Sequence, residues 1–137
     1  MKLASIRIIT SKIEELIKFY EKVTGIPLVR YTPDFAELQT QSVTLAIGST
    51  RTLELFGGDH VAQAGHNRSA IIEFRVENVD NDYDRLADYL ENCIVQKPTT
   101  LPWGNKSFLF RDPDNNLVNL FTPVTPEAIQ KFDRTPV

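Results

Sequence analysis

RDPDNNLVNLF, residues 111–121, is a tight polar turn that leads directly into a strand-like run. The Asp112 side chain can cap the turn, and Pro113 presets φ at its first corner position. The Asn-Asn pair that follows can adopt positive φ at little cost. Apolar residues then alternate through residues 117–121, which predicts a strand that carries Asn119 on its less apolar face.

Length and composition predict one globular domain spanning residues 1–137. The chain is 42% hydrophobic and 24% charged, which suits a buried core. Its formal net charge of −3, without clustered Lys and Arg, argues against a nucleic-acid partner. No apolar stretch reaches the roughly 18 residues that span a bilayer, and the first residues lack the apolar core of a signal peptide. The single cysteine, Cys93, indicates a structural thiol in a reducing compartment, so we expect a cytoplasmic protein without membrane partners.

The first half of the chain predicts a strand, a helix and then a group of strands. Residues 3–10 are rich in β-branched side chains and predict the first strand. Ser11 and Glu14 match a helix capping box, and apolar residues recur at helical spacing from Ile13 to Val23. Gly25 fits the left-handed position that ends a helix. Short alternating runs then predict strands over residues 28–31, 35–39, 42–47 and 51–56.

After a polar, glycine-bearing connector over residues 57–68, the same order begins again. A strand is expected over residues 69–76, and Asn78 or Asp80 can cap a helix that runs to about Leu90. Further strands are expected over residues 93–97, 107–110 and 117–121. Repetition of one unit along a chain is strong evidence for its architecture. The sequence therefore predicts two βαβββ modules, about residues 1–58 and 67–124, and a short C-terminal helix over 125–133.

Three motifs in these modules occur together in a known group of proteins. These motifs are Phe19-Tyr20 with Gly25, Pro102-Trp103-Gly104, and Asp112-Pro113-Asp114-x-Asn116. In them the chain resembles the vicinal oxygen chelate superfamily, which holds glyoxalase I, extradiol dioxygenases and bleomycin-resistance proteins. The resemblance covers about residues 3–123. It implies an α+β fold in which the two βαβββ modules form a curved mixed sheet around a cleft, with the helices outside. It also implies a packing role for Phe19-Tyr20 and a homodimer.

Alternation along four strands selects the side chains that would line such a cleft, because successive residues face opposite sides of a sheet. The selected face is apolar with a few polar groups, as small-molecule sites usually are. Its four charged residues can form a structural ion-pair network or orient a ligand, and both interpretations stay open. Trp103 joins the set because its loop often borders the cleft in the superfamily, and a role in packing or in a dimer interface is the alternative for this residue. The candidate ligand-binding residues are Arg7, Glu54, Phe56, Glu73, Arg75, Trp103, Asn119 and Phe121.

Metal enzymes of the superfamily place a ligand, typically His, Gln or Glu, at each of four cleft positions. The resemblance assigns these positions to Ser5, Glu54, Ile71 and Asn119. Only Glu54 would ligate well, because Ser and Asn are weak neutral donors and Ile has no donor. We therefore expect no divalent metal and no other cofactor. His60 and His66 lie in the connector at a spacing that fits no site on a helix or strand.

These observations favour a metal-free protein that holds a small organic ligand in the cleft, similar to bleomycin-resistance proteins. The alternative is a lyase, isomerase or dioxygenase-like enzyme of the same superfamily. Such an enzyme would use a divalent metal, or would take Glu54 or Glu73 as a general base. A third hypothesis is a structural or regulatory protein whose cleft is filled by its own side chains.

Overall fold

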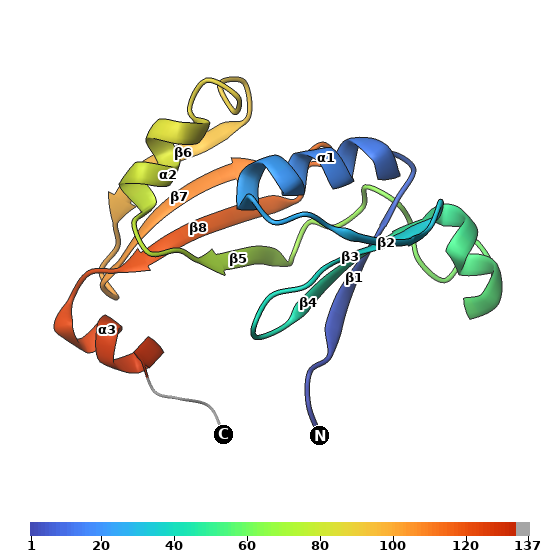
Figure 1. Ribbon diagram of the computed structural model, residues 1–137, viewed down its shortest axis with the longest axis horizontal. Helices are drawn as coiled ribbons and strands as arrows, with labels where there is room; N and C mark the ends of the chain where they lie inside the picture. The colour runs from blue at the N-terminus through green and yellow to red at the C-terminus, as the bar shows by residue number, and fades with distance from the viewer. Residues whose placement is uncertain (134–137) are drawn as a thin grey trace. The chain divides into compact units, whose positions relative to one another are not determined.

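The computed structural model describes residues 1–133, which form two compact units with a four-stranded sheet in each (Figure 1). Unit 1 comprises residues 1–68 together with the turn 112–115, and unit 2 comprises residues 69–111 and the chain from Asn116 onward. Both units follow the order strand, helix, three strands, which confirms the predicted α+β fold with two βαβββ modules. Within the described residues, no helix is long and apolar enough to cross a membrane.

The sheet of unit 1 has the strand order β1-β4-β3-β2. The first and last strands of the module, β1 and β4, pair in parallel, and the remaining pairs are antiparallel. The strands are β1 (Ser5–Thr10), β2 (Val29–Thr32), β3 (Phe35–Leu38) and β4 (Thr44–Ser49). Helix α1 (Ile13–Thr24) packs against β4 and β3. Its apolar residues recur at helical spacing and form one buried stripe of Leu16, Ile17, Phe19, Tyr20 and Val23.

The two ends of α1 differ in how well the sequence predicts them. Its N-cap is Lys12 and has no side-chain cap, so the predicted capping box of Ser11 and Glu14 is wrong. The Lys12 backbone N–H donates to Thr10 Oγ1 at 2.9 Å, and the Glu14 carboxylate pairs with Arg30 instead of turning back to the helix end. The C-terminal prediction is confirmed, because Gly25 has φ +71° and its N–H closes the last turn on Glu21 O.

Residues 50–56 correct the prediction of a strand over 51–56, because they form the 3₁₀ helix η1 (Thr50–Phe56). Strand β4 continues to Ser49, two residues beyond the predicted end at residue 47. The Ser49 hydroxyl then caps η1 by accepting from the Arg51 backbone N–H. Leu53 is buried whereas Leu55 is 93% exposed, so these leucines do not share one face as alternation along a strand would require.

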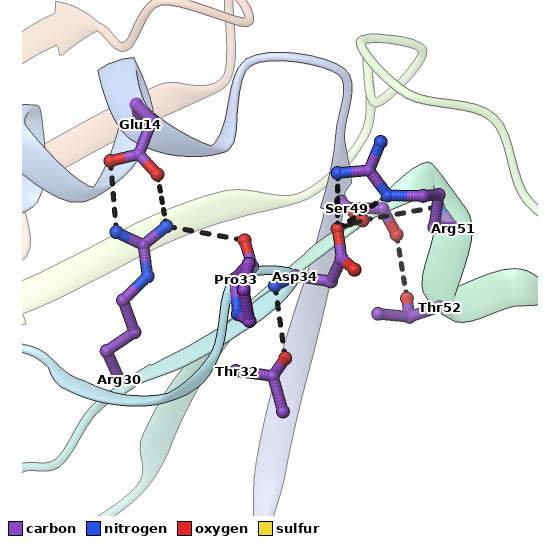
Figure 2. Close-up of polar contacts among 8 residues, drawn as sticks. All are labelled: Glu14, Arg30, Thr32, Pro33, Asp34, Ser49, Arg51 and Thr52. Atoms are coloured by element: carbon purple, nitrogen blue, oxygen red, sulfur yellow. Dashed lines mark hydrogen bonds and ion pairs between the residues drawn. The ribbon is translucent and has the colours of Figure 1, made fainter.

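The turn between β2 and β3 is held on both sides by arginine–carboxylate pairs (Figure 2). Arg30 reaches Glu14 of α1 with both terminal nitrogens. On the other side, Asp34 Oδ1 accepts from Arg51 Nε at 2.8 Å and from the Ser49 hydroxyl at 2.7 Å. The hydrogen bond from Arg51, followed by that from Ser49, lowers the pKa of Asp34. The contacts are exposed to solvent, so they orient the turn more than they stabilise the unit.

The sheet of unit 2 repeats the order of unit 1 as β5-β8-β7-β6, with β5 and β8 parallel. The strands are β5 (Ile71–Arg75), β6 (Ile94–Thr100), β7 (Asn105–Arg111) and β8 (Leu117–Pro123). Of the two predicted caps, Asn78 is the one that begins α2 (Val79–Leu86), and it accepts from the Asn81 N–H. The helix ends before the predicted Leu90, which is still fully buried. Helix α2 covers the face that carries Phe108, Phe110, Val118 and Leu120.

Segment 112–115 joins β7 to β8 in the chain but packs in unit 1, against α1. The Tyr20 hydroxyl donates to Asp112 Oδ2 at 2.6 Å, and both side chains are buried. Asp112 Oδ1 also caps the turn by accepting from the Asp114 backbone N–H, as the sequence predicts. Asn115 takes the positive φ, at 63°. The Phe19-Tyr20 motif and the Asp112 turn are therefore partners, although they lie 92 residues apart.

The buried Tyr20 phenol predicts a loss of stability at alkaline pH. Burial first, and then the Asp112 carboxylate, raise the pKa of Tyr20 well above its usual value of about 10. Above about pH 10 the unfolded chain releases the phenolic proton of Tyr20, while the folded chain retains it. Stability present below about pH 10 is therefore lost as pH rises. We expect the urea midpoint to fall more steeply between about pH 9.5 and 11 in the natural protein than in Tyr20→Phe. Tyr31→Phe removes an exposed phenol and is the control, so it should behave like the natural protein. Parallel curves for the natural protein and Tyr20→Phe would contradict this.

Candidate functional site

The face of the unit 2 sheet turned away from α2 brings together four of the five site residues that the sequence places in this unit, Glu73, Arg75, Asn119 and Phe121. Strand register sets Glu73 opposite Asn119 and Arg75 opposite Phe121 on parallel β5 and β8. On antiparallel β7, Leu109 lies opposite Asn119 and Ser107 opposite Phe121. Because residues two apart share a face, one surface is formed. We call this surface the β8 polar face and define it as Glu73, Arg75, Asn105, Ser107, Asn119 and Phe121.

The centre of the β8 polar face is a hydrogen bond between Asn119 and Glu73. Asn119 Nδ2 donates to Glu73 Oε2 at 2.8 Å. A carboxylate only accepts, so the amide must present its NH₂ group to Glu73. The amide oxygen, Oδ1, is then directed away from Glu73. The Asn119 side chain is only 7% exposed, so its orientation is set by this one contact and by the surrounding packing.

Three buried oxygens on the β8 polar face have no hydrogen-bond partner within the described residues: Asn105 Oδ1, Ser107 Oγ and Asn119 Oδ1. Ser107 is 1% exposed, so bulk solvent does not satisfy its hydroxyl. Leaving a buried polar atom unpaired costs about 1–3 kcal/mol, and most buried polar atoms in native proteins have a partner. All three oxygens lie on one face of the sheet.

Substitution of Ser107 tests whether its hydroxyl is unpaired in the ligand-free protein. Ser107→Ala removes the hydroxyl and keeps the small side chain, so we expect the free energy of unfolding to rise by about 1 kcal/mol. Ser5→Ala, on the exposed part of β1, is the control and should change it by less than about 0.5 kcal/mol. Urea unfolding measures both variants. A loss of stability in Ser107→Ala would contradict this and would mean that the hydroxyl already has a partner.

Helix α3 (Pro126–Asp133) lies against the β8 polar face. Its Phe132 ring packs on Phe121 with the ring centroids 5.1 Å apart. Arg75 donates to the Phe132 carbonyl at 2.9 Å and to the Asp133 carboxylate at 2.7 Å. The ion-pair network proposed among the cleft charges is therefore not formed in unit 2, because Arg75 pairs with α3 and Glu73 binds an amide.

The site residues predicted in unit 1 have a different arrangement. The Arg7 guanidinium lies over the Phe35 ring at 4.5 Å and the Phe56 ring at 5.0 Å, and these aromatic contacts take the place of the expected carboxylate. Glu54 lies in η1, so the alternation that placed it on a cleft strand does not apply. Register in unit 1 sets Ala46 opposite Arg7, as Asn119 is opposite Glu73 in unit 2. By module equivalence, Ala46 and not Glu54 corresponds to Asn119.

The donors at the superfamily's metal positions do not fit a divalent metal site. With Ala46 in place of Glu54, two of the four positions, Ala46 and Ile71, have no donor atom. The amide of Asn119 and the neighbouring Glu73 carboxylate supply two oxygen donors on the β8 polar face, fewer than the three or four protein ligands of a transition-metal site.

Trp103 and a nearby surface depression lie towards one end of the unit 2 sheet. Trp103, in the turn between β6 and β7, is 66% exposed and is not part of the β8 polar face. The depression lies at the carboxyl ends of β5 and β8 and is lined by Arg75, Val76, Glu77, Thr122 and Pro123. It borders the β8 polar face through Arg75.

Sequence reasoning missed Asn105 and Ser107, which contribute two of the three unpaired oxygens. A signal for them exists, because Asn105 and Ser107 alternate with Phe108 and Phe110 and so fall on the face opposite α2. The predicted strand began only at Ser107, so Asn105 fell outside it and its alternation with Phe108 and Phe110 was not considered.

Comparison with known families identifies the class of proteins to which this two-module chain belongs. The family model for the Glyoxalase/Bleomycin resistance protein/Dioxygenase superfamily matches residues 2–120. The chain belongs to this superfamily.

Similar proteins span nearly the whole chain. A family structure from Burkholderia phytofirmans PsJN has TM-score 0.77 and 17% identity, covering 90% of this chain and 100% of that one. A glyoxalase/bleomycin resistance protein/dioxygenase from Nocardioides has TM-score 0.73 and 20% identity, covering 92% and 85% respectively. The uncharacterized protein YraH of Bacillus subtilis (strain 168) is 26% identical over 125 residues, covering 88% of this chain and 98% of YraH.

Proposed function

We propose that this protein binds a small organic molecule at the β8 polar face and does so without a divalent metal in the superfamily's position. The observation that carries the proposal is the set of buried oxygens on Asn119, Ser107 and Asn105 that lack partners in the described part of the chain. A ligand that donates hydrogen bonds to them removes a cost of about 1–3 kcal/mol per atom. Apolar contact comes from Leu109 and Leu117, which neighbour Asn119 on the same face.

We propose a metal-free site because of the side chains at the superfamily's metal positions. Ile71 and Ala46 have no ligating atom, and an amide stands at position 119. A metal that polarises a carbonyl, enediolate or catecholate needs ligands that hold it firmly, and this chain lacks that combination.

Native mass spectrometry and elemental analysis of protein purified without added metal form the first test. We expect no stoichiometric zinc, nickel, iron or manganese, with or without a bound organic molecule. A thermal-shift screen of metabolites and antibiotics should then give compounds that raise Tm, since a ligand at about 100 times its Kd adds about 2.7 kcal/mol of stability. A stoichiometric metal would overturn the metal-free part of the proposal.

Two variants connect the thermal shift to the β8 polar face. Asn119→Leu removes the unpaired oxygen and the bond to Glu73, so it should abolish the ligand-induced shift. Asn81→Ala, on the exposed side of α2, is the control and should preserve the shift. If no compound raises Tm, or if Asn119→Leu leaves the shift intact, the proposed binding site is wrong.

Catalysis by Glu73 is the second candidate function, because its carboxylate is exposed and is oriented by Asn119. A general base must lie within hydrogen-bond reach of the proton that it removes. NMR of each bound compound incubated with the protein detects turnover. Turnover that is lost in Glu73→Gln while binding persists would establish the enzyme; binding without turnover would leave a binding protein.

A further inference from the structure

The unpaired groups of the β8 polar face share one hydrogen-bonding character. The amide oxygens of Asn105 and Asn119 are acceptors only, and the Ser107 hydroxyl can accept as well as donate. Glu73 is an acceptor with several lone pairs, and its one hydrogen bond within the described residues comes from Asn119. A ligand that fits this set supplies donors.

The charge of the same face also selects among ligands. Glu73 carries a negative charge that no cation of unit 2 neutralises within the described residues. Arg75 lies two positions further along β5, but its guanidinium binds the Phe132 carbonyl and the Asp133 carboxylate of α3. A ligand carboxylate would therefore be repelled by Glu73, whereas a cation would be attracted.

We propose that the ligand carries a protonated primary amine, whose ammonium group binds between Glu73, Asn119 Oδ1 and Ser107 Oγ. This inference rests on the proposed function of the same face. An ammonium group has three donors and no acceptor, and it meets three acceptors here. Asn119 pairs directly with Glu73, and Ser107 lies on the diagonal from Asn119, at a Cβ separation of roughly 7–8 Å or less. Asn119 on β8 therefore lies between Glu73 on β5 and Ser107 on β7.

The neighbouring side chains indicate the rest of the ligand. Ile71 and Leu117 lie opposite each other one step before Glu73 and Asn119 on the same face, and Leu109 flanks Asn119 on β7. Ile71 is 51% exposed, so an apolar group is available for contact. The ligand class is thus an amine with an apolar body next to its charged end.

Three probes of one shape separate charge from apolar contact: 2-phenylethylamine, 2-phenylethanol and phenylacetate. Isothermal titration calorimetry with the full chain measures each affinity. We expect the amine to bind at least about tenfold more tightly than the alcohol, and phenylacetate to bind most weakly, since charge-assisted hydrogen bonds are roughly twice as strong as neutral ones. Glu73→Gln should weaken amine binding by about tenfold or more and leave alcohol binding within about twofold. Glu91→Gln, an exposed carboxylate in the turns after α2, is the matched control and should change neither.

Different outcomes separate this inference from the proposed function. If phenylacetate binds as tightly as the amine, or Glu73→Gln retains amine affinity, the ammonium site is wrong. Binding of the alcohol or carboxylate that Asn119→Leu abolishes would then still support a small-molecule site at the β8 polar face. If none of the three probes binds at millimolar concentration, the ammonium inference is wrong, and the thermal-shift screen decides the proposed function independently.

Discussion

Asp112→Ala is expected to lower the free energy of unfolding by about 3 kcal/mol, the largest effect that we expect from removing one polar side chain. The substitution removes a buried carboxylate that accepts hydrogen bonds from the Tyr20 hydroxyl and from the Asp114 backbone N–H. Hydrogen bonds to charged groups contribute about 1.5–3 kcal/mol each, and the buried Tyr20 phenol loses its bond to Asp112. Urea unfolding measures the change.

Two further variants show whether the loss comes from the Tyr20–Asp112 contact. Tyr20→Phe leaves the carboxylate with its turn-capping bond, so a smaller loss of about 2 kcal/mol is expected. The double variant should lose less than the sum of the single losses, because both single changes break one bond. Tyr83→Phe, whose ring packs edge-on against Phe108, is the control and should cost less than about 0.5 kcal/mol. Additive losses would mean that the two residues act independently.

Gly104→Ala is expected to destabilise the protein by roughly 3 kcal/mol and to loosen α3. Gly104 has φ +94°, which costs an L-residue about 1–2 kcal/mol. A Cβ there would also overlap the Thr125 hydroxyl and lie 3.0 Å from Ala128 Cβ, at the start of α3. Overpacking of this kind adds about 1–3 kcal/mol. Urea unfolding measures the loss, and hydrogen exchange of the α3 amides measures the loosening.

Gly25→Ala is a matched control for the conformational part of this cost. Gly25 also has positive φ, at +71°, but among the described residues no atom beyond its chain neighbours lies within 4 Å of the position that a Cβ would take there. It should therefore lose about 1 kcal/mol and leave exchange in α3 unchanged. Equal losses in the two variants would show that Gly104 is needed for its φ alone and that contact with α3 does not matter.

Local patterns in the sequence were enough to predict most of the elements. Helical spacing of apolar residues from Ile13 to Val23 located α1, and Gly25 located its end. Alternation from Leu117 to Phe121 located β8 and separated Val118 and Leu120, which pack under α2, from Asn119. These predictions succeed because helix and strand periods depend on neighbours in sequence. The repeat of the βαβββ order predicted the architecture for the same reason.

Local patterns failed where tertiary contacts decide between alternatives. Residues 51–56 alternate as a strand would, but Ser49 caps them as η1 and Leu55 faces solvent. The error moved Glu54 onto a cleft strand and hid Ala46, whose equivalence to Asn119 comes only from strand pairing. The capping box at Ser11 failed because Glu14 pairs with Arg30, on a strand that follows the helix.

By itself, the sequence determined the two-module α+β fold and the location of Asn119 on the face opposite α2. Only the tertiary structure decided the partners of these residues. It set Asn119 against Glu73, left the oxygens of Asn119 and Ser107 buried without a partner in the described chain, and drew Arg75 to α3. The physical reason is that periodicity fixes the side of an element on which a residue lies, whereas hydrogen bonds depend on strand register and on contacts between residues distant in sequence.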